Sequence, residues 1–299
     1  MNASADPDEF FYRWPQRFAG HRPGAHHGIA LGSGQQAVAH RRLFDHPDPR
    51  RLDLRASLRA PHGDWLVRVA RPHVASALVA IVDVSPSMHF GARRHKIEVA
   101  AQFVRAMGWS AFRNGDAAGL MAFDHEEREE LHCPPRHGRG VSWALAQALA
   151  GARARRAPGH AGGRSPARGL IDCARRLAGR QALVFIVSDF HGLDATALRS
   201  VLDTLDAAVV VPMLAWDSAE THPPERDGLL LLADSESPRR AQVWMNAKLR
   251  ASWRAAVAAR RAELDGALAE RACPVFELCA APGGFDAQAL TRYFYEGQA

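Results

Sequence analysis

Two aspartates and two serines of this sequence stand where buried strands are expected to end. The apolar run "SALVAIVD" ends at Asp83, and Ser85 and Ser87 follow at alternate positions, while a second run, "VFIVSD", ends at Asp189. Ligands of open α/β sheets bind beyond the carboxyl ends of the strands, so both carboxylates open into one crevice if the two strands are neighbours. Such hard oxygen donors suit Mg²⁺ or Mn²⁺. In the alternative interpretation, the two aspartates cap the helices that follow.

Strands and helices alternate from Ala77 to the end of the chain, and this arrangement would position those side chains. The expected strands are short, continuous apolar runs, which indicate burial on both faces of a sheet. Helices between such strands require right-handed crossover connections. The sequence therefore predicts an α/β fold with a doubly wound, mostly parallel sheet. Strands are expected near 77–83, 117–124, 181–189, 207–217 and 274–280, and helices near 95–115, 141–156, 167–178, 194–205, 247–271 and 286–296.

Three segments are expected along the chain. Residues 1–30 are rich in His, Gly, Pro and Arg without a sustained period, and are expected to be flexible. Residues 31–75 are expected to form an N-terminal β-rich addition. There, Arg51–Ala70 alternates apolar and charged residues around the turn "APHGD", which predicts a β-hairpin that packs on the core. Residues 76–299 are expected to form the α/β domain, with a second hairpin inserted near residues 229–246.

The composition is that of an ordinary globular protein and argues against several classes of function. Of the 299 residues, 47% are hydrophobic and 23% are charged, and the net charge of +6 lies on scattered arginines without a block of like charge. We therefore expect no nucleic-acid binding. The four cysteines show no metal-binding spacing, the N-terminus is too polar for a secretion signal, and no run approaches the ~20 apolar residues of a membrane span. A cytoplasmic protein without a membrane span of its own is expected.

Several motifs of the sequence resemble those of a known family. The pattern Asp-x-Ser-x-Ser at Asp83–Ser87 resembles the metal-ion-dependent adhesion site of von Willebrand factor A domains. The stretches "DPRRLDLRAS" (Asp48–Ser57), "LVRV" (Leu66–Val69) and "RNGDAAGLMAFD" (Arg113–Asp124) are similar to motifs of the bacterial domain-of-unknown-function 58 family, although Leu54 stands where that family has Trp. The resemblance runs from about residue 50 to the C-terminus. It implies a sheet of von Willebrand factor A type.

The resemblance also implies a set of metal ligands, from which this chain departs on one loop. The matching ligand positions are Asp83, Ser85, Ser87 and Asp189. The Thr-Asp-Leu expected on a middle loop reads Arg164-Ser165-Pro166 instead. Three arrangements stay open: Ser165 supplies the missing hydroxyl, the site binds metal weakly, or Arg164 replaces the metal by pairing with the carboxylates. Because the positive charge of an arginine repels a cation, we expect weak binding of Mg²⁺ or Mn²⁺.

The resemblance implies a binding protein that is not an enzyme. Genes of the family typically stand beside those of MoxR-type AAA+ ATPases. This implies an adaptor in protein maturation or in metal or cofactor loading, and the presence of some members in methanol-oxidation gene clusters points to an alcohol or methanol dehydrogenase system. In an adhesion site of this kind, a partner's Asp or Glu completes the shell of the ion. We therefore expect a non-catalytic adaptor that contacts its client protein through an acidic residue.

The alternative is a Mg²⁺-dependent phosphoester hydrolase that works at the same crevice. Asp83 would then be the nucleophile or a metal ligand, and His89 or His191 would be the acid–base residue. The loop reads Asp-x-Ser and not the Asp-x-Asp of aspartyl phosphatases, which favours the adaptor.

Overall fold

The computed structural model divides the chain into two compact units. The larger unit comprises residues 1–13, 77–113 and 117–299, and the smaller unit comprises residues 14–76 and 114–116. The chain therefore leaves the larger unit after residue 13 and returns to it at residue 77. Within both units, the structure describes residues 8–13, 23–27, 36–45, 47–60, 63–71, 73–74, 76–152, 166–236, 239–281 and 283–296.

Over the described residues, a six-stranded sheet forms the centre of the larger unit. Its strand order is β12-β9-β8-β5-β6-β7, and all neighbouring pairs are parallel except β6 and β7. The strands are β5 (Ala77–Asp83), β6 (Ala117–Phe123), β7 (Cys133–Arg136), β8 (Leu183–Ser188), β9 (Val209–Leu214) and β12 (Phe276–Glu277). The predicted α/β architecture with a mostly parallel sheet is thereby confirmed.

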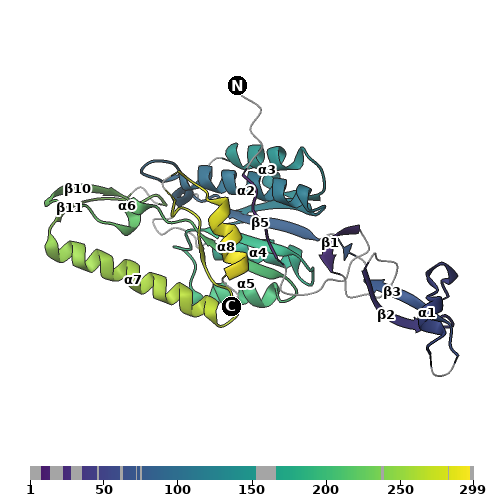
Figure 1. The fold of residues 1–299 in the computed structure, drawn as a ribbon. Helices are drawn as coiled ribbons and strands as arrows, with labels where there is room; N and C mark the ends of the chain where they lie inside the picture. The colour runs from purple at the N-terminus through teal and green to yellow at the C-terminus, as the bar shows by residue number, and fades with distance from the viewer. Residues whose placement is uncertain are drawn as a thin grey trace. The chain divides into compact units, whose positions relative to one another are not determined.

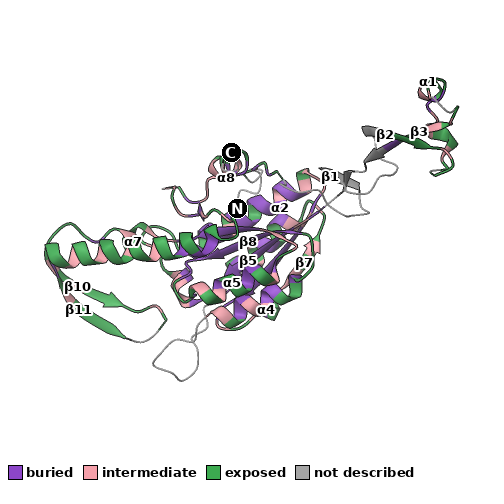
Figure 2. Cartoon of the chain, turned by 90° about the horizontal axis from the view of Figure 1, so that it is seen from below, coloured by how far each residue is buried: buried purple, intermediate pink, exposed green. Residues whose placement is uncertain are grey.

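Helices cover both faces of this sheet, as strands that are apolar along their whole length require. On one side of β5 lie α2 (Lys96–Arg113) and α3 (Val141–Ala150), and on the other lie α4 (Ala167–Leu177) and α5 (Ala195–Thr204) (Figure 1). Figure 2 shows the central strands buried between them. Short 3₁₀ turns follow β5 and precede β7, namely η2 (Pro86–His89) and η3 (Glu129–Leu131).

Phe10 and Tyr12 are buried in the core of the larger unit, so the expectation of a flexible segment over residues 1–30 is wrong for residues 8–13. The Phe10 side chain is fully buried, with its ring 6.2 Å from that of Phe103 and 6.4 Å from that of Phe294 in α8 (Ala287–Glu296). Burial of one such ring contributes about 2–3 kcal/mol. The apolar residues Phe10 and Tyr12 thus outweigh the polar composition around them.

A hairpin and a long helix are inserted between β9 and β12. The hairpin pairs β10 (Gly228–Ala233) with β11 (Arg240–Met245), and Figure 2 shows both strands mostly exposed. The long helix, α7 (Ala247–Ala269), packs in the core only near its C-terminal end, through Leu264 and Leu268. In the part of the chain that the structure describes, no helix has both the length and the apolar character needed to cross a membrane.

The smaller unit contains two antiparallel strand pairs in its described part. One pair joins β2 (Gln36–Arg42) to β3 (Leu66–Arg71), and the other joins β1 (Pro23–His27) to β4 (His73–Val74). β3 therefore takes its partner from a segment that precedes the predicted hairpin.

The first arm of the hairpin predicted over Arg51–Ala70 is reduced to one isolated antiparallel bridge, between Leu52 and Val67, and most of it is not a strand. In its place are the 3₁₀ turn η1 (Pro49–Arg51) and the helix α1 (Leu54–Ser57). Asp53 accounts for the helical turn, since its carboxylate accepts a hydrogen bond from the Ala56 N–H (3.1 Å) and caps α1. Arg68 Nε donates to the same carboxylate (2.8 Å) and, as the main cause, lowers the pKa of Asp53.

Candidate functional site

The carboxyl ends of β5 and β8 lie side by side at one edge of the sheet, since the two strands are paired in parallel. Asp83, the last residue of β5, is fully buried. Its Oδ1 accepts from the backbone N–H of Ser85 (2.9 Å), and its Oδ2 accepts from the hydroxyl of Ser188 (2.6 Å). Burial, with the nearby charge of Asp189, raises the pKa of Asp83 to about 7.

A buried lysine faces the second aspartate of this edge. Lys96 is the first residue of α2, and its side chain is only 1% exposed. Its Nζ lies 2.9 Å from Asp189 Oδ2 and 2.8 Å from Glu220 Oε1, a residue of α6 (Ser218–Thr221). Burial opposes the charge of the ammonium group, but the two carboxylates outweigh it and raise the pKa of Lys96. Burial likewise opposes the charge of Asp189, but Lys96 and His191 lower the pKa of that carboxyl.

The turn after β8 is held in a strained conformation. Phe190 has a φ of 56°, which bulky residues rarely adopt and which costs about 1–3 kcal/mol. Its N–H donates to Ser188 Oγ (2.9 Å), and its carbonyl accepts from the guanidinium group of Arg260. Trp216 Nε1 donates to the carbonyl of Asp189 (2.8 Å). These contacts fix the backbone that carries the Asp189 carboxylate towards Lys96.

The two serines of the loop after β5 bond to each other and to a distant carboxylate. The hydroxyls of Ser85 and Ser87 lie 3.0 Å apart. The backbone N–H of Ser87 donates to Oε1 of Glu236 (2.9 Å), which lies in the turn between β10 and β11. Partial loss of hydration raises the pKa of Glu236, while its bonds to Ser87 act in the opposite direction. An acidic side chain of the hairpin therefore lies at the mouth of the predicted site.

The structure brings most of the predicted ligands to one edge of the sheet: Asp83, Ser85, Ser87 and Asp189. Ser165 and Arg164 lie outside the described residues, so the arrangements that involve them stay predictions. Weak binding of Mg²⁺ or Mn²⁺ also stays a prediction.

The donor groups as they stand do not fit a divalent ion. Both oxygens of Asp83 accept hydrogen bonds from the chain, and the hydroxyls of Ser85 and Ser87 bond to each other. The Asp189 carboxylate is paired with the ammonium group of Lys96, whose positive charge repels a second cation.

Sequence reasoning missed Lys96, Ser188 and Glu220. Lys96 stands at the start of a helix, where the helix dipole disfavours a cation, and that conflict is a signal that the sequence carries. Glu220 closes a capping box with Asp217 in "DSAE", a pattern that could have placed it on a short helix. Ser188 lies within an apolar strand, and nothing in the sequence pairs it with Asp83.

The two histidines proposed for acid–base catalysis have different surroundings. His89 is half-buried in η2, and burial lowers its pKa, with the positive charges of His95 and Arg128 acting in the same direction. His191 is exposed and stacks on the ring of Trp216, with centroids 5.7 Å apart. The described hydrogen bonds of Asp83 go to serines and to neither histidine.

The half-buried thiol of Cys279 is held in its protonated form. All four cysteines are free, and burial raises the pKa of Cys279 to about 12. Such a thiol stays protonated at neutral pH, and the thiolate is the reactive form.

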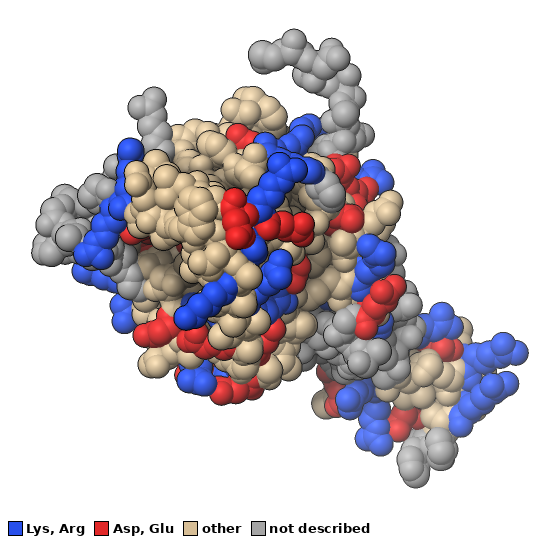
Figure 3. All heavy atoms as spheres, turned by 90° about the vertical axis from the view of Figure 1, so that its left-hand side faces the viewer, with Lys and Arg blue, Asp and Glu red and all other residues tan. Residues whose placement is uncertain are grey.

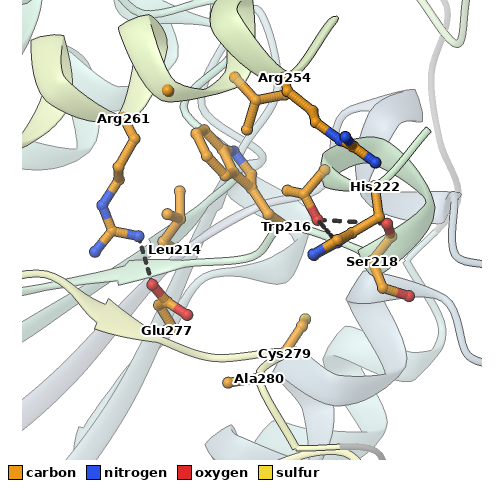
Figure 4. Close-up of a pocket in the computed structure, with 12 residues that line it drawn as sticks. Leu214, Trp216, Ser218, His222, Arg254, Arg261, Glu277, Cys279 and Ala280 are labelled. Carbon is orange, nitrogen blue, oxygen red and sulfur yellow. Dashed lines mark hydrogen bonds and ion pairs between the residues drawn. The ribbon is translucent and has the colours of Figure 1, made fainter. Parts of the chain in front are cut away.

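A cavity of about 750 Å³ lies next to this edge, between α7 and the strands β9 and β12 (Figure 4). Leu214, Trp216 and Cys279 are among the residues that line it, and Arg261 pairs with Glu277 at 2.6 Å along the wall. Trp216 lines the cavity and also contacts the sheet edge, since its indole N–H donates to the Asp189 carbonyl. A ligand in this cavity would therefore contact a residue that supports the strained turn.

Basic and acidic side chains alternate on the face of the larger unit shown in Figure 3. In the larger unit, ion pairs such as Arg199 with Glu270 (2.7 Å) and Arg250 with Asp227 (2.7 Å) also bring basic and acidic side chains together. On this face, the positive net charge of the chain is thus not gathered into a patch of one sign.

The sequence matches the family described as "Protein of unknown function DUF58" over residues 43–263, which is most of the chain. The chain belongs to this family. The DUF58 region begins in the smaller unit and includes both Asp83 and Asp189, so the edge that holds Lys96 is part of it.

No curated protein matches this DUF58 chain at a significant level. Among solved structures, an aerotolerance-related membrane protein from Bacteroides fragilis NCTC 9343, with multiple mutations to serine, is similar over 74% of this chain and 98% of that chain. The two sequences are 10% identical and the TM-score is 0.46. A similarity of this size carries no conclusion about function.

Proposed function

We propose that this DUF58 protein is a non-catalytic adaptor of von Willebrand factor A type that binds a client protein through an acidic side chain. The contact between Ser87 and Glu236 carries the proposal. A backbone N–H of the loop after β5 donates to a carboxylate that comes from 149 residues further along the chain. The loop thus already holds an acidic side chain, and a client's Asp or Glu would use the same donor when Glu236 withdraws.

The weak hold on Glu236 supports this exchange. Its side chain is exposed. Lost hydration is the main factor that raises the pKa of its carboxyl, and the negative charges of Asp189 and Asp234 act in the same direction. An exposed hydrogen bond of this kind contributes about 1 kcal/mol or less, which a client with further contacts exceeds.

The hairpin that carries Glu236 also offers apolar surface to a partner. Leu229 and Leu231 are exposed on β10, and Trp244, opposite Leu229 on β11, is exposed as well. Residues two apart on a strand share a face, so these three side chains form one apolar strip. Contiguous exposed apolar groups are typical of protein-binding surfaces.

We further propose that the adaptor works with a MoxR-type AAA+ ATPase in protein maturation or in metal or cofactor loading, with an alcohol or methanol dehydrogenase system as the first client to examine. Family membership and the resemblance described above support this part of the proposal. The hydrolase alternative has less support, because Asp83 is closed in by Ser85 and Ser188 and has no histidine among its described hydrogen-bond partners.

The test is a binding measurement between the purified chain, the MoxR-type ATPase encoded nearest to its gene, and candidate clients. We expect wild type to bind, and Ser87→Pro, which removes the donor N–H, to weaken client binding by about tenfold, or about 1.4 kcal/mol. Ser87→Ala is the matched control, since it keeps the N–H and should lose less affinity. Phosphatase turnover that disappears in a folded Asp83→Asn variant would instead establish the hydrolase.

A further inference from the structure

We propose that the ammonium group of Lys96 is the resident cation of this sheet edge, and that it takes Asp189 out of the ligand set of a metal-ion-dependent adhesion site. The inference concerns the occupancy of the site and does not depend on whether the chain is an adaptor. It predicts a site that works without a metal and that becomes a metal site when the lysine is removed.

The position of the ammonium group is the first argument. It lies within hydrogen-bond distance of two carboxylates from separate segments, Asp189 after β8 and Glu220 on α6. Lys96 itself comes from α2, so three elements converge on one buried positive charge. A divalent ion bound by Asp189 and Glu220 would have to displace the ammonium group.

The cost of placing a lysine there is the second argument. The side chain is buried and stands at the N-terminal end of an 18-residue helix, where the backbone dipole disfavours a positive charge. A buried charge of this kind persists only with good compensation from partners. Asp189 and Glu220 supply it, so the carboxylates and not the helix account for a lysine at this position.

The composition of the chain is the third argument. Lys96 and Lys248 are the only lysines among 38 basic residues. An ammonium group is a compact point charge, whereas a guanidinium group is planar and larger. Almost all other basic residues of the chain are arginines. The buried position at Lys96 instead holds an ammonium group, which is closer to a metal ion in size and charge distribution than a guanidinium group is.

The donors around the ammonium group make the consequence testable. Ligand atoms of Asp189, His191 and Glu220 all lie within 4.8 Å of one another. Lys96→Ala removes the charge between them and leaves space, with two carboxylates and one imidazole around it. Carboxylate and imidazole donors together suit a transition metal such as Mn²⁺ better than Mg²⁺.

The experiment measures Mn²⁺ binding by the full chain, with free Mn²⁺ followed by electron paramagnetic resonance. We expect only weak Mn²⁺ binding in wild type and in the control Lys248→Ala, which removes the exposed lysine. Lys96→Ala should bind Mn²⁺ at one site at least about tenfold more tightly than wild type, a difference of about 1.4 kcal/mol. A wild-type site as tight as this that disappears in Asp189→Asn would overturn the proposal, and so would a folded Lys96→Ala variant that binds Mn²⁺ no more tightly than wild type.

A second measurement on wild type decides the question even if Lys96→Ala does not fold. Protein labelled with ¹³C-lysine gives signals from only two lysine side chains, and Lys248→Ala assigns them. Mn²⁺ bound at the sheet edge would broaden the Lys96 signals selectively. We expect them to stay sharp, and selective broadening of Lys96 would contradict the proposal.

Discussion

At the scale of single residues, the chain itself limits the negative charge at the sheet edge. Lys96 pairs its ammonium group with Asp189, and burial raises the pKa of Asp83 to about 7, which favours its neutral form below that pH. Protonation of Asp83 is therefore part of the charge arrangement, and it makes stability depend on pH.

We expect the free energy of unfolding to fall as the pH is raised from about 4 to 8, because of Asp83. Its pKa is raised in the folded state, so between these values the folded chain binds more protons than the unfolded chain and loses stability as the proton leaves. The contribution is at most about 4 kcal/mol. Urea unfolding of Asp83→Asn at pH 5 and pH 8 should remove this part of the slope, while Asp206→Asn, at an exposed position, should keep it. Parallel profiles for wild type and Asp83→Asn would contradict the assignment.

We expect Lys96→Met to destabilise the chain by about 3–5 kcal/mol, the range for removing one partner of a buried ion pair. The substitution keeps an apolar stem of similar length but leaves Asp189 and Glu220 without their common cation. Lys248→Met should change the free energy of unfolding by less than about 0.5 kcal/mol, because that side chain is exposed. Equal effects of the two substitutions would show that the pairing of Lys96 contributes nothing.

At the scale of secondary-structure elements, the β10–β11 hairpin is joined to the site at its tip. Glu236 lies in its turn, and Ser87 lies in the loop after β5. Most of the two strands is exposed, and few of their side chains are held by the core. The contact between Glu236 and Ser87 therefore helps to hold the tip against the site.

We expect Glu236→Ala to free the tip of the hairpin without changing the stability of the fold. The melting temperature should stay within about 2 °C of wild type, since a single exposed contact contributes about 1 kcal/mol or less. Trypsin should cleave faster at Arg239 and Arg240, which follow the turn, as followed by mass spectrometry. Glu225→Ala, at another exposed glutamate, is the control. Unchanged cleavage in Glu236→Ala would show that the tip is held by other contacts.

The sequence could predict those elements whose pattern is local. β5 and β8 were predicted because each is a continuous apolar run, and Asp83 and Asp189 because each follows such a run. α1 was missed because apolar and charged residues alternate around Leu54, as they do in a strand. The carboxylate of Asp53 stabilises a helix there by capping its N-terminus.

Other parts of the site depend on pairings between distant segments. Lys96 meets Asp189 across 93 positions, and Ser87 meets Glu236 across 149. A lysine or a glutamate is usually solvated, so neither residue type indicates such a partner on its own. Only the folded chain shows which charges are brought together.

At the scale of the whole molecule, the larger unit is formed by segments on both sides of the smaller unit in the sequence. Residues 8–13 complete the core of the larger unit before the smaller unit begins. Besides its contacts with Phe103 and Phe294, the ring of Phe10 lies 6.1 Å from Phe185 in β8, and its N–H donates to Ser110 Oγ in α2. Phe10 therefore contacts both a helix and a strand that lie far from it in the sequence.

We expect Phe10→Ala to destabilise the larger unit by about 3–5 kcal/mol, the range for a buried phenylalanine that leaves a cavity. Phe44→Ala is the matched control, because Phe44 in the smaller unit is 95% exposed and its loss should cost less than about 0.5 kcal/mol. Urea unfolding followed by tryptophan fluorescence and circular dichroism measures both variants. Because Phe10 packs against Phe185 in β8, Phe10→Ala should also speed amide exchange along that strand, which ends beside Asp189. If Phe10→Ala and Phe44→Ala have equal effects, residues 8–13 are not part of the core.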